Sequence, residues 1–179
     1  MQFDGVDDYI AVNGVSDHVG VYLEEGELSL KVTMEAWLCP FSETGATSRY
    51  AISFNQSDKN ERIHLGYVTN EDHGNRFAYW NANYNELYSE MSFSPGKWYH
   101  VAVTMNDASR KLYINGELDN SMSATGNLSN SSSPLTFGGS DNHSSPVYND
   151  VLIDEVAVWS EALTQSEIQS NMYSSLTGY

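Results

Sequence analysis

Carboxylates lie at both ends of the chain, each within an apolar–polar pattern that is typical of a β-strand. Residues 3–10 read Phe-Asp-Gly-Val-Asp-Asp-Tyr-Ile, and residues 153–159 read Ile-Asp-Glu-Val-Ala-Val-Trp. If the first and last strands are neighbours in one sheet, acidic side chains from both ends of the chain converge there. Such a group of oxygens suits a hard cation such as calcium, which accepts ligands from separate segments and tolerates irregular geometry.

Aromatic rings alternate with asparagines in residues 79–88. Sugar rings have an apolar C–H face and a hydroxyl rim, so they favour aromatic platforms beside amide and carboxylate groups. We expect Tyr84 and Tyr88 at loops or strand ends, where binding residues often lie. Each aromatic taken alone also fits core packing, as Tyr79 and Trp80 would on opposite faces of a strand. The candidate ligand-binding residues, including two from a later polar loop, are Tyr79, Trp80, Asn83, Tyr84, Tyr88, Asn142 and Tyr148.

The same residue types do not favour catalysis. A retaining glycosidase needs two carboxylates about 5 Å apart on the sugar-facing surface. Asp154 and Glu155 are adjacent, so we expect them on opposite faces of a strand. The five histidines have no metal-binding spacing such as His-x-x-x-His. Cys39, the only cysteine, lies in an apolar context typical of a buried, inert thiol. We expect no enzyme activity.

The charge balance is strongly acidic, with 24 acidic and 8 basic residues and a net charge of −16. Such a field repels phosphate backbones and anionic membranes, which excludes nucleic acid as a partner. Cations and neutral sugars remain compatible, and the charge also fits a role in solubility alone. The apolar runs are too short to span a bilayer, so no membrane insertion is expected.

Strand and turn signals dominate the pattern that must position these residues. The Asn115–Gly116 pair is a strong hairpin signal, because both residues tolerate a positive φ. One helix is predicted near the end, where Thr164 and Glu167 fit a capping box. Three tryptophans, Trp37, Trp98 and Trp159, are expected in the core. The predicted strands are residues 19–23, 28–38, 49–54, 63–68, 76–80, 98–105, 111–114, 117–119, 135–139 and 151–159.

Several of these segments, in this order, resemble the laminin G-like family of the concanavalin A-like lectin/glucanase superfamily. The segments that carry the resemblance are residues 3–10, 30–37, 96–104, 111–116, 135–139, 153–156 and 162–168. The resemblance implies a two-sheet antiparallel jelly roll, which agrees with the strand pattern. The family occurs in large extracellular adhesins and polysaccharide-binding proteins, and a cation often lies near its first strand or at a loop edge. It thereby makes Asp4 and Asp154 the leading metal-binding candidates, with Asp141 at a possible rim site.

We therefore expect an all-β sandwich with one short C-terminal helix, in which residues 1–179 form a single domain excised from a longer secreted or cell-surface protein. Fold alone does not decide function. The favoured function is a non-catalytic, calcium-binding module that recognises a glycan or polysaccharide or mediates adhesion. Two alternatives stay open on the same fold. One is a protein-binding or structural spacer module, and the other is a degenerate glycoside hydrolase.

Overall fold

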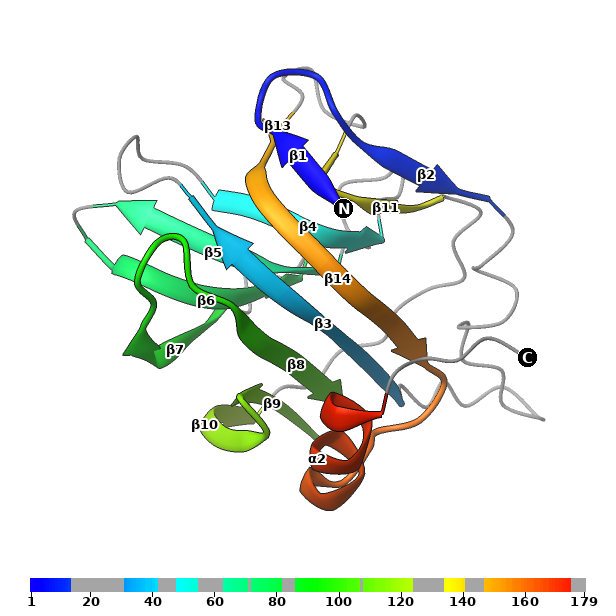
Figure 1. The fold of residues 1–179 in the computed structure, drawn as a ribbon. Coiled ribbons are helices and arrows are strands. Elements are labelled where there is room, and N and C mark those ends of the chain that lie inside the picture. Colours follow the sequence, from blue (N-terminus) through cyan, green and yellow to red (C-terminus); the bar gives the residue numbers. More distant parts are fainter. Residues whose placement is uncertain are drawn as a thin grey trace.

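The computed structural model describes residues 1–13, 31–41, 48–54, 63–70, 72–81, 86–106, 108–123, 134–140 and 147–174, which form two six-stranded antiparallel sheets and one helix (Figure 1). Sheet A has the order β1 (Gln2–Asp4), β14 (Asp150–Trp159), β3 (Val32–Pro40), β8 (Tyr99–Met105), β9 (Ser109–Ile114) and β10 (Glu117–Ser123). Sheet B has the order β2 (Ile10–Val12), β11 (Leu135–Phe137), β4 (Ser48–Phe54), β5 (Ile63–Asn70), β6 (Gly74–Asn81) and β7 (Glu86–Ser92). A two-stranded pair, β12 (Gly139–Ser140) and β13 (Val147–Tyr148), and helix α2 (Gln165–Tyr173) complete the described elements.

The core lies between the two sheets and follows the period-two alternation of the strands. On β3, the even-numbered residues from Val32 to Leu38 are fully buried and belong to one hydrophobic cluster with residues of sheet B such as Leu65 and Phe77. Burying one such side chain contributes about 1.5–3 kcal/mol. This arrangement confirms the predicted all-β jelly-roll sandwich.

Helix α2 covers one end of the outer face of sheet A (Figure 1). Its start is the predicted capping box, because the Thr164 side chain accepts a hydrogen bond from Glu167 N and the Glu167 carboxylate accepts one from Thr164 N. Ile168 packs against Ala102 and Tyr113 on the strands below. None of the helices in the described part of the chain is long and apolar enough to cross a membrane.

The predicted chain ends do meet in sheet A. Strand β1 pairs with β14, so that Gln2 faces Leu152, Phe3 faces Val151 and Asp4 faces Asp150. The glycine at position 138, with φ of 77°, lies so close to the Phe3 ring that a Cβ there would come within 2.1 Å of it. The first and last strands are therefore neighbours, as the sequence predicts.

Some local predictions were wrong. Tyr88 lies in the middle of β7, and the strand predicted to begin at Glu117 continues to Ser123 as β10. The three tryptophans are not core residues: Trp98 is 43% exposed, and Trp37 and Trp159 are half-buried. Trp37 is an odd-numbered residue of β3, whose even-numbered residues fill the core, so it faces outward. The strand predicted at residues 19–23 lies outside the described residues.

Candidate functional site

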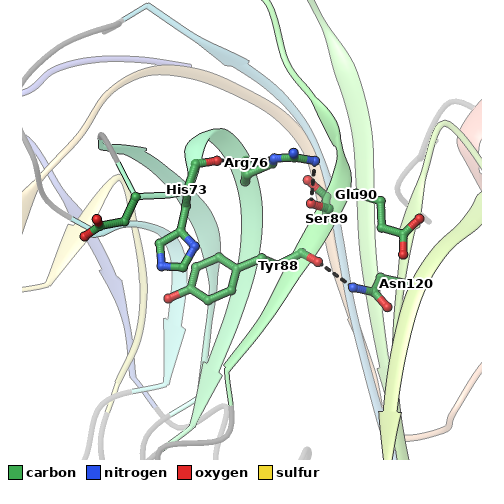
Figure 2. A pocket seen from close by; sticks show the side chains of 7 residues that line it. His73, Arg76, Tyr88, Ser89, Glu90 and Asn120 are labelled. Carbon is green, nitrogen blue, oxygen red and sulfur yellow. Dashed lines mark hydrogen bonds between the residues drawn. The ribbon is translucent and has the colours of Figure 1, made fainter.

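A groove with a volume of about 360 Å³ lies where the edge strand β7 of sheet B meets β10 of sheet A (Figure 2). We call it the Tyr88 groove. It combines rings, charged groups and an amide from four elements: the β5–β6 turn, β6, β7 and β10. Its lining residues are Asp72, His73, Arg76, Tyr88, Ser89, Glu90 and Asn120.

The aromatic part of the groove is a stack of His73 on Tyr88. The ring centroids are 4.0 Å apart and the ring planes differ by 12°. His73 lies in the turn between β5 and β6, where its backbone N–H donates to the Asn70 side chain at 2.8 Å. Because His73 is exposed and Tyr88 is half-buried, the stack presents ring surface to solvent. Such a surface suits the C–H face of a sugar ring.

Further rings support Tyr88 from below. Tyr88 meets Trp80 edge to face at 6.3 Å, and Trp80 meets Tyr50 edge to face at 5.4 Å. Tyr50 is stacked on His64 at 4.0 Å. The Tyr88 hydroxyl donates to Glu86 Oε2. Burial, together with this neighbouring carboxylate, raises the pKa of Tyr88 to about 12. Tyr88 is therefore a neutral, firmly oriented ring at physiological pH.

The polar rim is held in place by hydrogen bonds to backbone carbonyls, two of which Figure 2 shows as dashed lines. Arg76 donates through Nε to His73 O at 3.2 Å and through Nη1 to Ser89 O at 3.0 Å. Asn120 Nδ2 donates to Tyr88 O at 2.9 Å. These bonds fix a guanidinium group and an amide beside the ring stack.

The guanidinium group of Arg76 keeps part of its donor capacity for a ligand. Within the described residues, Arg76 forms no ion pair with either acidic residue of the rim, Asp72 or Glu90. Its Nε and Nη1 donate to backbone carbonyls, whereas its Nη2 has no protein acceptor in that part of the chain. Since arginine carries five N–H donors, the Nη2 group remains available to an incoming hydroxyl.

The sequence-predicted ligand residues are distributed over several places. Tyr88 lines the groove and Trp80, only 6% exposed, lies beneath it. Tyr79 points the other way: it is fully buried in the core, where its hydroxyl accepts from Arg110 Nε at 3.3 Å. Tyr148 lies in β13, where its carbonyl accepts from Arg49 of β4, and β4 is separated from β6 and β7 by β5. The other three, Asn83, Tyr84 and Asn142, lie outside the described residues.

The sequence reasoning missed most of the groove. His73 and Arg76 flank a tight turn at Gly74, whose φ of 66° marks the β5–β6 hairpin. Asn120 belongs to the other sheet, and only the packing of β10 against β7 brings it to the site. Asp119 fixes that contact by accepting hydrogen bonds from the backbone N–H groups of Glu90 and Met91, at 2.6 and 3.0 Å. The glycine was the one local signal for this turn.

The predicted metal ligands do not come together as expected. Asp4 lies opposite Asp150, whereas Asp154 lies opposite Trp37. At roughly 3.3 Å per residue, the Cα atoms of Asp4 and Asp154 are about 13 Å apart along the strand direction. Asp4 instead lies near two other exposed acids, Asp7 and Asp8, and one carboxylate oxygen of each falls within 4.8 Å of the others. Asp141 lies outside the described residues.

The geometry defines a two-sheet sandwich with a ring-lined groove at its edge. The sandwich fold is shared by lectins and glycosidases. The sequence matches the family described as the concanavalin A-like lectin/glucanases superfamily over residues 4–169. The chain belongs to this family. No curated protein matches its sequence.

Three solved structures illustrate the shared fold. Domain 4 of AbnA, an extracellular arabinanase from Geobacillus stearothermophilus solved with arabinotriose, has a TM-score of 0.61 at 20% identity over 80% of this chain and 66% of that one. The Trypanosoma rangeli sialidase has a TM-score of 0.67 at 16% identity, over 94% of this chain and 26% of the sialidase. A pentraxin from Limulus polyphemus has a TM-score of 0.64 at 15% identity, over 94% of this chain and 78% of the pentraxin. The chain thus spans just under two thirds of the arabinanase structure and about a quarter of the sialidase, and these identities show the fold alone.

Proposed function

We propose that this chain is a non-catalytic carbohydrate-recognition module and that the glycan binds in the Tyr88 groove. The observation that carries the proposal is the solvent-facing His73–Tyr88 stack, with Arg76, Asp72 and Glu90 around it. The rings offer a platform for the C–H face of a sugar. The guanidinium group donates to sugar oxygens, and the two carboxylates accept from sugar hydroxyls.

The mixture of charges in the groove favours a neutral, hydroxyl-rich ligand. Arg76 alone does not form the cationic cluster that an acidic glycan would need, because Asp72 and Glu90 oppose its charge. The whole chain carries a net charge of −16, which adds to the repulsion of an anionic ligand. We therefore assign a neutral oligosaccharide or polysaccharide to the groove.

The surroundings of the carboxylates support a binding role rather than a catalytic one. Asp72 and Glu90 are both exposed to water. The general acid of a glycosidase instead occupies an apolar environment that favours its protonated form. The groove supplies hydrogen-bond partners and a ring platform, which are the requirements of recognition.

Calcium is proposed as a structural ion at Asp4, Asp7 and Asp8. Two oxygens that both lie at a calcium–oxygen distance of about 2.4 Å are at most about 4.8 Å apart. One carboxylate oxygen from each of the three residues lies within 4.8 Å of the others. Asp4 Oδ1 also accepts from Val6 N at 2.8 Å, so the turn already orients this side chain. The three residues fit a calcium ion, with water molecules completing the coordination. The ion would neutralise three exposed like charges and fix the segment between β1 and β2.

The setting of the module follows from the same proposal. A glycan-binding or adhesion module acts on a secreted or cell-surface protein, and we propose this location for the chain. That residues 1–179 form one domain of a longer protein stays a prediction from the sequence.

The test of the groove is a glycan array probed with the wild-type chain and with Tyr88→Ala and His73→Ala. Both variants should lose binding to the neutral glycans that the wild type retains. Tyr173→Ala is the matched control, because Tyr173 is 82% exposed and distant in sequence from every lining residue. Retention of glycan binding by both groove variants would refute the assignment.

The array is run again with calcium and with a chelator, and thermal unfolding is measured under the same two conditions. If Asp4, Asp7 and Asp8 bind the ion, the chelator lowers the melting midpoint of the wild type but not that of Asp7→Asn. An unchanged midpoint in the wild type would rule out a structural calcium ion there and would leave the glycan site to be judged on the Tyr88 variants alone.

A further inference from the structure

A second pocket lies on the outer face of sheet A, away from the Tyr88 groove. Its volume is about 280 Å³, and its lining residues are Trp37, Trp98, Asp154 and Glu155. We call it the Trp98 pocket. It combines two indole rings with two carboxylates, and no basic side chain is among its described lining residues.

Cross-strand pairing explains why these residues meet. Asp154 of β14 lies directly opposite Trp37 of β3, and Trp37 lies directly opposite His100 of β8. Directly opposed residues project on the same face of a sheet. Trp98 precedes His100 by two positions, which places it on that face as well. The strand register therefore builds a row of Asp154, Trp37 and His100, with Trp98 beside it.

A β-bulge adds the second carboxylate. Between Asp154 and Ala157, β14 has one more residue than the facing part of β3, and Glu155 has a positive φ of 48°. Neighbouring residues of a regular strand would point to opposite faces, as expected from the sequence. The bulge overturns that expectation, because it re-aims the backbone so that Asp154 and Glu155 line the same pocket. A non-glycine residue at positive φ is unfavourable, and such conformations cluster at functional sites.

The indole rings are available to a ligand. Trp98 is 43% exposed, and Trp37 is half-buried. Trp37 is oriented by His100, with the two rings edge to face at 5.5 Å and 69°. A cation that lies over the face of a tryptophan is attracted by the ring, and tryptophan is the strongest partner of this kind. Two adjacent carboxylates then supply the counter-charge.

We infer that the Trp98 pocket binds a positively charged lysine or arginine side chain from a basic segment of a partner protein. The methylene stem lies along the indole rings and the charged end reaches Asp154 and Glu155. A calcium ion would use the carboxylates but gain little from the exposed rings. The net charge of −16 attracts a basic partner to this acidic surface. This inference is separate from the glycan site and does not depend on it.

The experiment follows the tryptophan indole N–H signals by NMR during titration with a short peptide that has one lysine among glycines and serines. The same peptide with acetyl-lysine is the matched probe, because acetylation removes the charge and keeps the stem. The lysine peptide should shift the signals of Trp98 and Trp37 in a saturable manner and leave Trp80, which lies on sheet B, unchanged. The acetylated peptide should bind at least tenfold more weakly.

Variants locate the contact. Trp98→Ala and Glu155→Gln should each weaken binding of the lysine peptide at least tenfold, with the melting midpoint recorded for each variant to verify folding. Glu90→Gln removes the same charge from sheet B and should leave the affinity within twofold. Equal loss in Glu90→Gln would show attraction by net charge only and overturn the proposal.

Two other outcomes also contradict it. An absence of saturable shifts at millimolar lysine peptide means that the pocket does not bind the side chain. Displacement of the same indole signals by calcium alone, with no response to the peptide, assigns the pocket to a metal ion instead. Tyr88→Ala should leave lysine binding intact, so failure of this inference is distinguishable from failure of the glycan site.

Discussion

The Tyr88 groove and the Trp98 pocket combine similar residue types at different places of the sandwich, yet we propose different ligands for them. Each pairs aromatic rings with two carboxylates. The groove adds Arg76, which supplies donors and offsets part of the negative charge. The pocket has no such residue in the part of its lining that the structure describes. One basic residue thus separates a surface suited to neutral hydroxyl groups from one suited to a cation.

The two sites also differ in what supports them. Beneath Tyr88 lie further rings, Trp80 and Tyr50. Beneath the Trp98 pocket lies a buried titratable pair, because His100 contacts Trp37 and its Nε2 lies 3.8 Å from Glu35 Oε2. Glu35 Oε1 accepts from Trp159 Nε1 at 2.8 Å and from Asn171 Nδ2 of α2 at 3.1 Å. The support of the pocket should therefore respond to pH.

The largest expected effect is on stability in acid. Burial lowers the pKa of His100 from 6.5 to about 4, so between these values the unfolded chain binds a proton at this residue that the folded chain does not. Stability falls as the pH is lowered from 6.5 to 4, by up to roughly 3 kcal/mol. Burial also raises the pKa of Glu35 above 4.5, so the folded chain retains that proton and stability falls as the pH rises through that value.

His100 and Glu35 thus have opposite effects on how stability depends on pH, and substitutions separate the two effects. Relative to the wild type, Glu35→Gln should steepen the loss of stability in acid, and His100→Gln should remove most of that loss. Urea unfolding at a series of pH values between 4 and 7 measures both. Parallel pH profiles for the wild type and His100→Gln would show that this histidine does not titrate on unfolding.

The next largest effect is the loss of affinity for one ligand in each of two variants. Tyr88→Ala should lower glycan affinity and Trp98→Ala should lower lysine-peptide affinity, each by about 2 kcal/mol or roughly thirtyfold, in keeping with the loss of an aromatic contact. Each variant should leave the other ligand unaffected. Calorimetric titration of both variants with both ligands gives the four affinities. If one substitution lowers the affinity for both ligands, the two sites are not independent.

Ionic strength sharpens the same contrast. Raising salt screens exposed charge pairs. The lysine peptide should therefore bind several-fold more weakly at high salt, while the affinity for a neutral glycan should change little. If the affinity for the lysine peptide did not depend on salt, the carboxylates of the Trp98 pocket would not contribute to its binding.

A smaller effect tests the role of Tyr79. Its hydroxyl is one of the acceptors of the fully buried Arg110. Tyr79→Phe should destabilise the chain by about 1.5 kcal/mol, because a buried charged donor loses a partner. Glycan affinity should not change. Tyr88→Phe is the control, since its hydroxyl pairs with the exposed Glu86 and its removal should alter stability by less than about 0.5 kcal/mol. Denaturant unfolding distinguishes the two.

Local patterns were sufficient to predict the fold but not the sites. Alternation on β3, the Asn115–Gly116 turn and the Thr164 capping box are short-range signals, and the structure confirms each of them. The neighbouring chain ends were also predicted. The pairing of Asp4 with Asp150 rather than Asp154 was not, because strand register depends on contacts between distant segments.

The same limit applies to the side chains that line the two sites. Trp98 is exposed although tryptophan is usually well buried. Asp154 and Glu155 share a pocket because of one extra residue in β14, which no periodicity reveals. His73 and Asn120 meet Tyr88 from different segments of the chain. Sequence reasoning identified Tyr88 as a candidate ligand-binding residue, and the structure shows that tertiary packing supplies the neighbours of that ring.

The smallest expected effect concerns the bulge at Glu155. Glycine adopts a positive φ without steric cost, so Glu155→Gly should leave stability unchanged or raise it by up to about 1 kcal/mol. The same change removes a carboxylate from the Trp98 pocket and should lower the affinity for the lysine peptide at least tenfold. Glycan binding at the Tyr88 groove should not change. A chain that becomes more stable while it loses one ligand would show that this glutamate is retained for binding, whereas destabilisation with unaltered peptide affinity would make the bulge purely structural.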